Sequence, residues 1–299
     1  MGRTLLSGAA AVTPTTTFKD NPMADKAKPE DFMGRFREII SDPLNLLIRR
    51  VPDAGLVSAD LVTLHNGLRV PFSGPHAYYD GFSDILALNR GVHEPLEEYA
   101  FQQLLTVLPA APTMLELGAY WGHYSMWLKH SRAHAEVHLV EPVLNNLQAG
   151  MANFQRHGLK GEFIHAFVGA QQFRVDQFVA LRGIQQLDVL HADIQGHEVE
   201  MLLGCEALLA AGRITYAFVS THSQDLHRQT LALLQKHAYR IEAQADFDVG
   251  TTSYDGFVFA SCQQVRPVFL DFAPLARVDI NRSSPQALAS YVARLATAA

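Results

Sequence analysis

The segment PTMLELGAYWGHYS, Pro112–Ser125, has the pattern of a β-strand, a glycine turn and the first turn of a helix. The apolar strand run ends at Glu116. Gly118 and Gly122 follow, and a helix is predicted to begin near His123. In open α/β sheets, ligands bind at the carboxyl ends of the strands, where such turns lie. This segment therefore predicts an α/β fold and the position of its ligand.

A second apolar run, Val137–Val140, ends in an acidic residue, Glu141. In nucleotide-binding α/β folds, a carboxylate at the end of the second strand, about 20 residues after the glycine turn, binds the ribose hydroxyls. The two segments together predict a site for a cofactor that contains adenosine.

The spacing of the glycine turn favours S-adenosylmethionine (SAM) over a dinucleotide. A pyrophosphate requires a G-x-G-x-x-G turn, whose backbone N–H groups approach it closely, whereas this turn reads E-x-G-x-x-x-G. The carboxylate of Glu116 would repel a phosphate, but it suits the ammonium and sulfonium groups of SAM. Two other interpretations stay open here, a nicotinamide oxidoreductase and an ordinary α/β turn with a surface glutamate.

The composition is that of an enzyme domain without nucleic-acid or membrane partners. The chain has 299 residues, 48% of them hydrophobic, so a large buried core is expected. The formal net charge is −6 and no basic run occurs, which argues against nucleic acid and anionic membranes. Cys205 and Cys262 are far apart, as expected for reduced thiols of a cytoplasmic protein. No apolar stretch approaches membrane-spanning length, and the N-terminus lacks a signal-peptide core.

Four regions are predicted along the chain: a flexible leader at 1–30, an N-terminal extension at 31–110, the cofactor-binding core at 111–262 and a tail at 263–299. The extension should contain helices and one hairpin, predicted at Asp31–Ile40, Asp42–Arg50, Pro95–Leu108 and around Asn66-Gly67. The tail should end in a helix that opens at Pro285 and could serve a homodimer contact.

The core alternates strand-like and helix-like runs. Strands are predicted at Thr113–Leu117, Glu136–Val140, Glu162–Val168, Leu187–Asp193, Ile214–Thr221, Tyr239–Ala245 and Gly256–Ala260. Helices are predicted after Gly122 and at Leu144–Arg156, Glu198–Ala211 and Gln224–His237. The loop between the last two strands is too short for a crossover helix, so these strands should form an antiparallel hairpin. A doubly wound, Rossmann-like sheet of about seven strands with such an ending is the class I methyltransferase architecture, in contrast to dinucleotide domains that continue in parallel.

Polar residues follow the fourth and fifth predicted strands. Asp193 and Gln195 come directly after the fourth strand and are expected in the crevice beside Glu116. Asp193 is a catalytic candidate, with helix capping as the alternative. His222 follows the fifth strand, and a neutral imidazole with a pKa of about 6.5 could accept the proton of a hydroxyl. His222 is therefore the second catalytic candidate, a general base, unless it only caps the next helix.

The motifs LELGAYWGHYS, VHLVEP, LDVLHADIQGHE, VSTHSQDLH and YDGFVFA, in this order, resemble the FkbM family of SAM-dependent methyltransferases. The resemblance spans roughly Leu61–Ala260. It implies a class I fold and methyl transfer from SAM, typically to a hydroxyl oxygen of a sugar or of a polyketide-like natural product. It also matches Asp193, Gly196 and Glu198 to the family signature D-x-[EQ]-G-x-E, with Gln195 where glutamate is commoner.

The expected cofactor residues are Glu116, Gly118, Tyr120, Gly122, Ser125, Glu141, Asp193 and Gln195. Two features depart from the family pattern. Tyr120 and Trp121 are bulkier than the residues usual in the turn, and either stack on a ligand or pack. The third connection, 169–186, is short and only partly helical, so the adenine pocket could be built differently.

Three questions stay open at the level of sequence. No metal site is assigned, but a variant has Asp193 and His222, with Asp248 or His197, hold a divalent cation that polarises the acceptor oxygen. A protein that binds SAM without catalysis is a further alternative. The acceptor is expected to be a small molecule, and the loop Gly74–Asp84, with its aromatic residues, is a candidate to line it.

Overall fold

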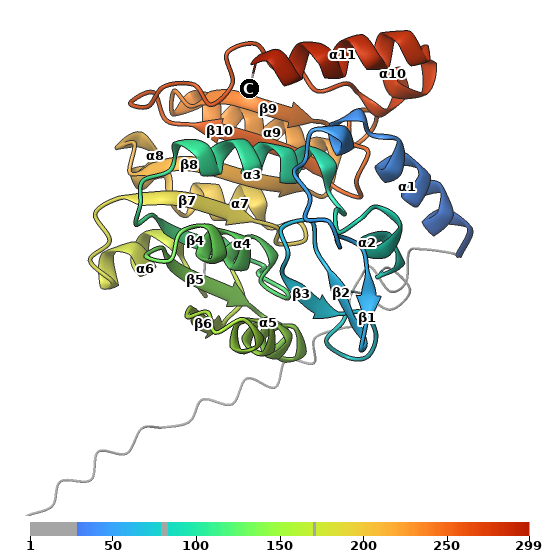
Figure 1. The fold of residues 1–299 in the computed structure, drawn as a ribbon. Helices are drawn as coiled ribbons and strands as arrows, with labels where there is room; N and C mark the ends of the chain where they lie inside the picture. Colours follow the sequence, from blue (N-terminus) through green and yellow to red (C-terminus); the bar gives the residue numbers. More distant parts are fainter. Residues whose placement is uncertain (1–28, 79–82, 170–171, 299) are drawn as a thin grey trace, which may run out of the picture.

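The computed structural model describes residues 29–78, 83–169 and 172–298 of the chain (Figure 1). The predicted leader lies almost wholly outside these residues. So do Tyr79 and Phe82 of the loop expected to line the acceptor, whereas Tyr78 of that loop is described.

The central feature is a seven-stranded sheet. Its strands, in spatial order, are β6 (Glu162–His165), β5 (Glu136–Glu141), β4 (Thr113–Leu117), β7 (Leu187–Ala192), β8 (Ile214–Thr221), β10 (Gly256–Ser261) and β9 (Arg240–Ala245). The first five are parallel, and β10 runs antiparallel to both β8 and β9. The prediction of a doubly wound sheet that ends in an antiparallel hairpin is confirmed.

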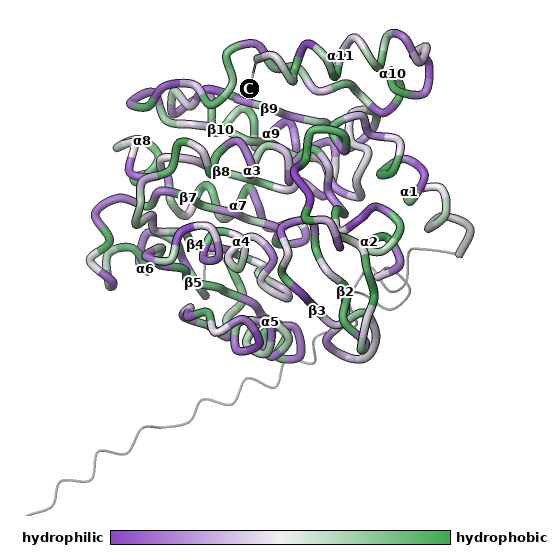
Figure 2. Tube along the Cα trace, viewed as in Figure 1, coloured by the Kyte–Doolittle hydropathy of each residue, from purple (hydrophilic) through white to green (hydrophobic). Residues whose placement is uncertain are grey.

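Alternation along the strands builds two apolar layers, one on each face of the sheet. On β4, Met114 belongs to one buried cluster and Leu115 to the other, and on β8 Phe218 and Ala217 divide in the same way. Green and purple segments also alternate along the tube of Figure 2, as amphipathic elements require.

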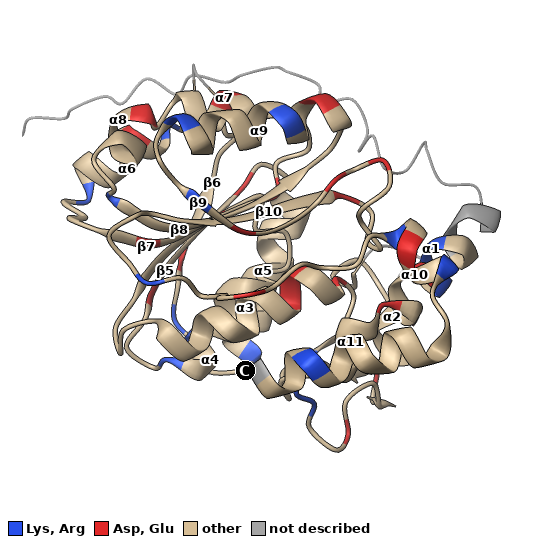
Figure 3. Cartoon of the chain, turned by 90° about the horizontal axis from the view of Figure 1, so that it is seen from above, with Lys and Arg blue, Asp and Glu red and all other residues tan. Residues whose placement is uncertain are grey.

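Helices cover both faces of the sheet, as Figure 3 shows from above. One face carries α3 (Pro95–Val107), α4 (His123–Ser131) and α5 (Leu144–Arg156). The other carries α6 (Val175–Leu181), α7 (Glu198–Leu203), α8 (Glu206–Ala210) and α9 (Gln224–Lys236). The single helix predicted at Glu198–Ala211 is wrong in one respect, because the chain leaves the helical path at Gly204 and Cys205 and resumes it as α8.

The N-terminal extension packs against the α3 face. Its elements are α1 (Pro29–Ser41), η1 (Pro43–Leu46), β1 (Val57–Ser58), β2 (Leu61–Thr63), β3 (Arg69–Pro71) and α2 (Asp84–Leu88). The hairpin is confirmed, with Gly67 in the left-handed region at φ 89°. The helix predicted at Asp42–Arg50 is wrong: only a 3-10 turn forms, which Asp42 caps by accepting the backbone N–H of Leu44.

The tail contains α10 (Arg277–Arg282), which the sequence did not predict, and α11 (Pro285–Ala298). Ser284 accepts the backbone N–H of Ala287 at 3.2 Å, as a helix cap does. Tyr291 and Leu295 of α11 are buried in the same cluster as the extension. None of the helices in the described ranges is long and apolar enough to cross a membrane.

Candidate functional site

The turn between β4 and α4 is held tightly against the neighbouring strand ends. Gly118 has a φ of 70°, and a Cβ at this position would lie 1.7 Å from the carbonyl oxygen of Asp193. Only glycine permits this approach. The backbone N–H groups of Gly118 and Ala119 both donate to the carbonyl of Val140, at 2.9 and 3.0 Å. The turn is therefore fixed between the ends of β5 and β7.

Glu116 lies beneath this turn and is buried. Its carboxylate accepts the backbone N–H of Ser125 at 3.0 Å in the first turns of α4. Burial raises the pKa of Glu116, while the neighbouring imidazole of His191 and the contacts with Ser125 oppose the rise. Glu116 is thus both part of the cavity wall and a support for the helix that starts after the glycine turn.

Glu141, at the end of β5, is held by the backbone of the two loops beside it. One carboxylate oxygen accepts the N–H of Tyr120 at 2.9 Å, and the other accepts the N–H of Val143 at 2.8 Å. Burial raises the pKa of Glu141, and these hydrogen bonds counter the rise. Each oxygen has further lone pairs that could accept ribose hydroxyls.

These residues line one cavity of about 510 Å³. Six of the eight expected cofactor residues are in its wall: Glu116, Gly118, Tyr120, Glu141, Asp193 and Gln195. Gly122 and Ser125 are not in the wall but lie behind it. Gly122 has a φ of 80°, and a Cβ there would come within 3.2 Å of Leu139 and Phe154. The cavity-binding roles of these eight residues stay a prediction.

The cavity has two ends, defined by the strand order. The cofactor end lies over β4 and β5, where Glu141, Asn146 and Phe167 are found. The acidic end lies over β7, β8 and β10. There the cavity is lined by Asp193, Ser220 and Asp255, together with Glu94 and Glu97 from the start of α3 and Tyr254. The names cofactor end and acidic end are used for these two regions below.

Asp193 and Gln195 occupy a strained loop between β7 and α7. Gln195 is a non-glycine residue at φ 51°, and Gly196 follows at φ 103°. The side-chain amide of Gln195 donates to Asp193 at 3.1 Å. Glu198 is fully buried, and its carboxylate accepts the backbone N–H of Gly196 at 3.0 Å. The loop is thus held in one shape at the middle of the cavity.

His222 lies behind these residues and does not itself line the described part of the cavity. Its Nδ1 contacts Glu198 at 2.7 Å, and its Nε2 lies 3.2 Å from Asp193 and 3.4 Å from Asp255. Although burial opposes protonation, these carboxylates raise the pKa of His222 to about 11. The imidazole therefore already carries a proton at neutral pH, and the prediction of a neutral general base does not fit this arrangement.

Three carboxylates of the acidic end, those of Glu94, Glu97 and Asp255, have raised pKa values, whereas the contact with His222 lowers the pKa of Asp193 despite its burial. Burial, together with the charge of neighbouring carboxylates, raises the pKa of Glu94 to about 7 and that of Glu97 to about 8. Burial raises the pKa of Asp255 to about 7, although His222 opposes the rise. Groups that titrate near neutral pH in a cavity are candidates for proton transfer.

Glu94, Glu97 and Asp255 were not predicted as site residues, although Asp255 lies in the motif YDGFVFA and the two glutamates lie just before and within the first turn of the predicted helix Pro95–Leu108. For the metal variant, the described cluster that could hold an ion consists of Asp193, His222 and Asp255, whereas Asp248 is exposed on the loop before Asp255. His197 pairs instead with Glu200 at 3.2 Å.

The strand order, the glycine turn and the two strand-end carboxylates define a class I methyltransferase domain. The protein-family model described as "Methyltransferase FkbM domain" matches residues 78–241, which is more than half of the chain. The chain therefore belongs to the FkbM methyltransferase family. It is a SAM-dependent methyltransferase.

Comparisons with curated proteins and with solved structures give no match that is similar enough to assign a function. No curated protein matches the sequence. A precorrin-6y C5,15-methyltransferase from Geobacter metallireducens is 11% identical, with a TM-score of 0.39 over 56% of this chain and 86% of its own. TrmK of M. capricolum, solved with S-adenosylhomocysteine, is 12% identical, with a TM-score of 0.39 over 64% of this chain and 80% of its own. Similarities this low carry no argument, and the fold assignment rests on the observed strand order.

Proposed function

We propose that the protein transfers the methyl group of SAM to a hydroxyl oxygen of a polyhydroxylated small molecule, such as a sugar. The observation that supports this is the acidic end of the cavity, where Glu94, Glu97, Asp193 and Asp255 lie together with Ser220. Carboxylates accept hydrogen bonds from hydroxyl groups, and the rings of Tyr78, Trp121 and Tyr254 offer apolar faces beside them.

The cofactor end fits SAM. Glu141 would bind the ribose, Phe167 and Val143 offer apolar surface for the adenine, and Glu116 gives this region negative charge without a phosphate-binding turn. When bound, SAM supplies an electrophilic methyl group and an additional positive charge. A positive charge in the cavity favours the ionised form of the nearby carboxylates, so it would lower their raised pKa values.

Asp255 is the residue that we assign as general base. Its carboxylate would accept the hydroxyl proton while the acceptor oxygen takes the methyl group and S-adenosylhomocysteine leaves. His222 is then a positioning residue, because its imidazolium holds Asp193 and Asp255 at 3.2 and 3.4 Å. Most of the rate would come from holding the two reacting groups in contact within the cavity.

A second form of this reaction uses a divalent cation. The ligand atoms of Asp193, His222 and Asp255 all lie within 4.8 Å of one another. These residues could hold a cation that polarises the acceptor oxygen, provided that His222 gives up its proton. Activity that is lost in EDTA and restored by Mg²⁺ or Mn²⁺ would support this form, and full activity in EDTA would exclude it.

The test of the proposal is transfer of a ¹³C-labelled methyl group from SAM to members of a panel of sugars, nucleotide sugars and hydroxylated natural products. We expect S-adenosylhomocysteine release and a product whose ¹³C shift is that of a methoxy group. Label found on nitrogen or carbon would contradict O-methylation. A protein that binds SAM by calorimetry but transfers methyl to no acceptor would support the non-catalytic alternative.

A further inference from the structure

A second cluster of ionisable side chains lies next to the glycine turn between β4 and α4, outside the acidic end. It consists of His65 from the turn between β2 and β3, Glu98 from α3, and His123, the first residue of α4. All three are buried, with exposed fractions of 1%, 0% and 4%. The cluster therefore joins the N-terminal extension to the first residue after the glycine turn.

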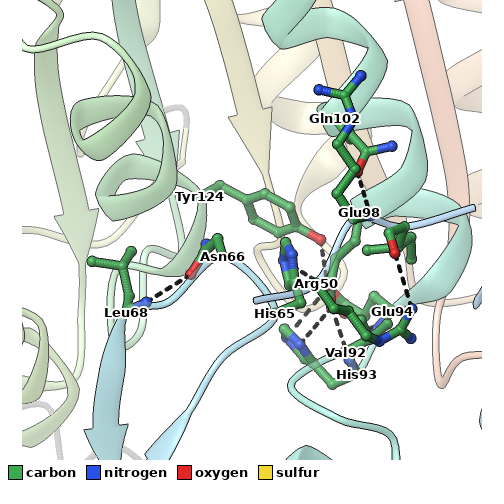
Figure 4. A network of polar contacts seen from close by, with 12 residues as sticks. Arg50, His65, Asn66, Leu68, Val92, His93, Glu94, Glu98, Gln102 and Tyr124 are labelled. Carbon is green, nitrogen blue, oxygen red and sulfur yellow. Dashed lines mark hydrogen bonds and ion pairs between the residues drawn. The ribbon is translucent and has the colours of Figure 1, made fainter. Parts of the chain in front are cut away.

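The two oxygens of Glu98 have different surroundings. Oε1 accepts the backbone N–H groups of His93 and Glu94, at 2.8 and 3.0 Å, and the ring of His93 lies 2.8 Å away. Oε2 forms an ion pair with Nε2 of His65 at 3.0 Å and has no further hydrogen-bond partner among the described residues. Figure 4 shows the imidazoles of His65 and His93 directed toward this carboxylate.

The imidazole of His123 lacks polar partners beside this ion pair. Both of its ring nitrogens are buried and make no hydrogen bond within the described part of the chain. Buried polar groups are nearly always satisfied, so two unpartnered nitrogens next to a buried carboxylate call for an explanation. Two imidazole nitrogens and one carboxylate oxygen within 4.8 Å of one another form a recognised set of metal ligands.

The distances suit a small ion. The ligand atoms of the three residues lie within 4.8 Å of one another. An ion with bonds of about 2.0–2.2 Å in tetrahedral geometry separates its ligands by roughly 3.3–3.6 Å. Nε2 of His65 and Oε2 of Glu98 are 3.0 Å apart, so a small rearrangement of the side chains would complete the site, and the contacts to Oε1 would hold the carboxylate in place.

We propose that His65, Glu98 and His123 bind a divalent first-row transition metal, with Zn²⁺ the best match to the two nitrogen donors and one oxygen donor. Mg²⁺ and Ca²⁺ are disfavoured because they prefer oxygen ligands. The ion fastens the β2–β3 hairpin to α3 and to the start of α4, and so fixes the end of the glycine turn that leads into α4. His123 and His93 line the cavity, which gives the ion a route of entry.

The test begins with the full-length protein, stripped of metal with dipicolinate, given Zn²⁺ or Co²⁺ and then desalted. We expect about one ion per chain by mass spectrometry, intense visible absorption of the Co²⁺ form typical of a four-coordinate site, and a higher melting temperature with Zn²⁺. His65→Gln and Glu98→Gln should each lower metal affinity at least about tenfold. Two matched controls should leave it unchanged: His130→Gln, exposed on the same helix as His123, and Asp255→Asn in the acidic end.

The proposal is overturned if the wild-type protein retains no Zn²⁺ or Co²⁺ after desalting, or if His65→Gln retains as much as the wild type. It is also overturned if Asp255→Asn, rather than His65→Gln, removes the ion, because the metal would then sit in the acidic end. Should the variants fail to fold, the wild-type Co²⁺ spectrum decides, since an octahedral oxygen site gives only weak absorption.

Discussion

The two ends of the cavity are built in different ways. At the cofactor end, the carboxylate of Glu141 is held by backbone N–H groups of the adjacent loops, and the shape of the turn depends on Gly118. At the acidic end, the carboxylates come from α3, the end of β7 and the loop before β10. The shape of the cofactor end thus depends on short stretches of backbone. The acidic end depends on side chains that are distant in the sequence and come together only in the folded protein.

This difference has an electrostatic consequence. The hydrogen bonds to Glu141 oppose the effect of burial on its pKa. Burial and the charge of Asp193 raise the pKa of Glu97 to about 8, and the side-chain hydrogen bond from Ser220 only partly opposes the rise. The cofactor end is thus preorganised for binding, whereas the acidic end contains groups that exchange protons near neutral pH.

The largest effect is expected for Gly118→Ala. The added Cβ would meet the carbonyl oxygen of Asp193 at 1.7 Å, so the turn must move and SAM affinity should fall by roughly a hundredfold or more. Calorimetric titration with SAM measures this. Gly183→Ala is the matched control, because Gly183 has a similar φ of 66° but no atom within 4 Å of the added Cβ. Equal losses in the two variants would contradict the backbone account of the cofactor end.

The next effect concerns Asp255→Asn, which removes the assigned base. Turnover should fall about a hundredfold while the affinity for SAM changes little, because Asp255 lies at the other end of the cavity. In the wild type, kcat/KM should rise as pH increases through about 7, where Asp255 loses its proton, and the variant should lose this limb. Asp248→Asn, exposed on the same loop, is the control. A parallel loss of SAM binding and turnover would contradict the separation of the two ends.

Glu141→Ala should have a smaller effect, confined to cofactor binding. The substitution leaves the N–H groups of Tyr120 and Val143 without their acceptor and removes the expected ribose contact, so SAM affinity should fall about tenfold. Glu136→Ala, exposed at the start of the same strand, should bind SAM like the wild type. Unchanged affinity in Glu141→Ala would place the ribose elsewhere.

The smallest effect is on stability. Glu97 and Asp255 have folded-state pKa values of about 8 and about 7, above those of the unfolded chain. At a pH between the unfolded and the folded pKa of each group, the folded protein retains a proton that the unfolded chain has lost. The free energy of unfolding must therefore fall as pH rises from about 6.5 to about 8. The melting temperature of the SAM-free protein should drop by about 5 °C over this range, and Glu97→Gln should flatten the drop. A melting temperature that rises over this range would contradict the raised pKa values, and Asp271→Asn, exposed, should behave like the wild type.

The sequence predicted the sheet, its antiparallel ending and the cofactor because each depends on local patterns. Glycines that must adopt left-handed conformations and acidic residues at strand ends leave signals within a few positions, as Gly118 and Glu141 do. The prediction of His222 as a neutral base assumed an unperturbed imidazole and could not anticipate the three carboxylates that raise its pKa to about 11. The break between α7 and α8 was also missed, because its only local signal is one glycine.

The reversed direction of β10 has a consequence for how the family can diversify. Because β10 is antiparallel, its first residue, Gly256, pairs with Thr221 at the carboxyl edge of the sheet, and the loop before it reaches the acidic end. Insertions or deletions in that hairpin loop would reshape the chamber for the second substrate without disturbing β4 or β5. If the acceptor binds at the acidic end, as we propose, changes in this loop would alter acceptor choice while leaving the strands of the cofactor end as they are.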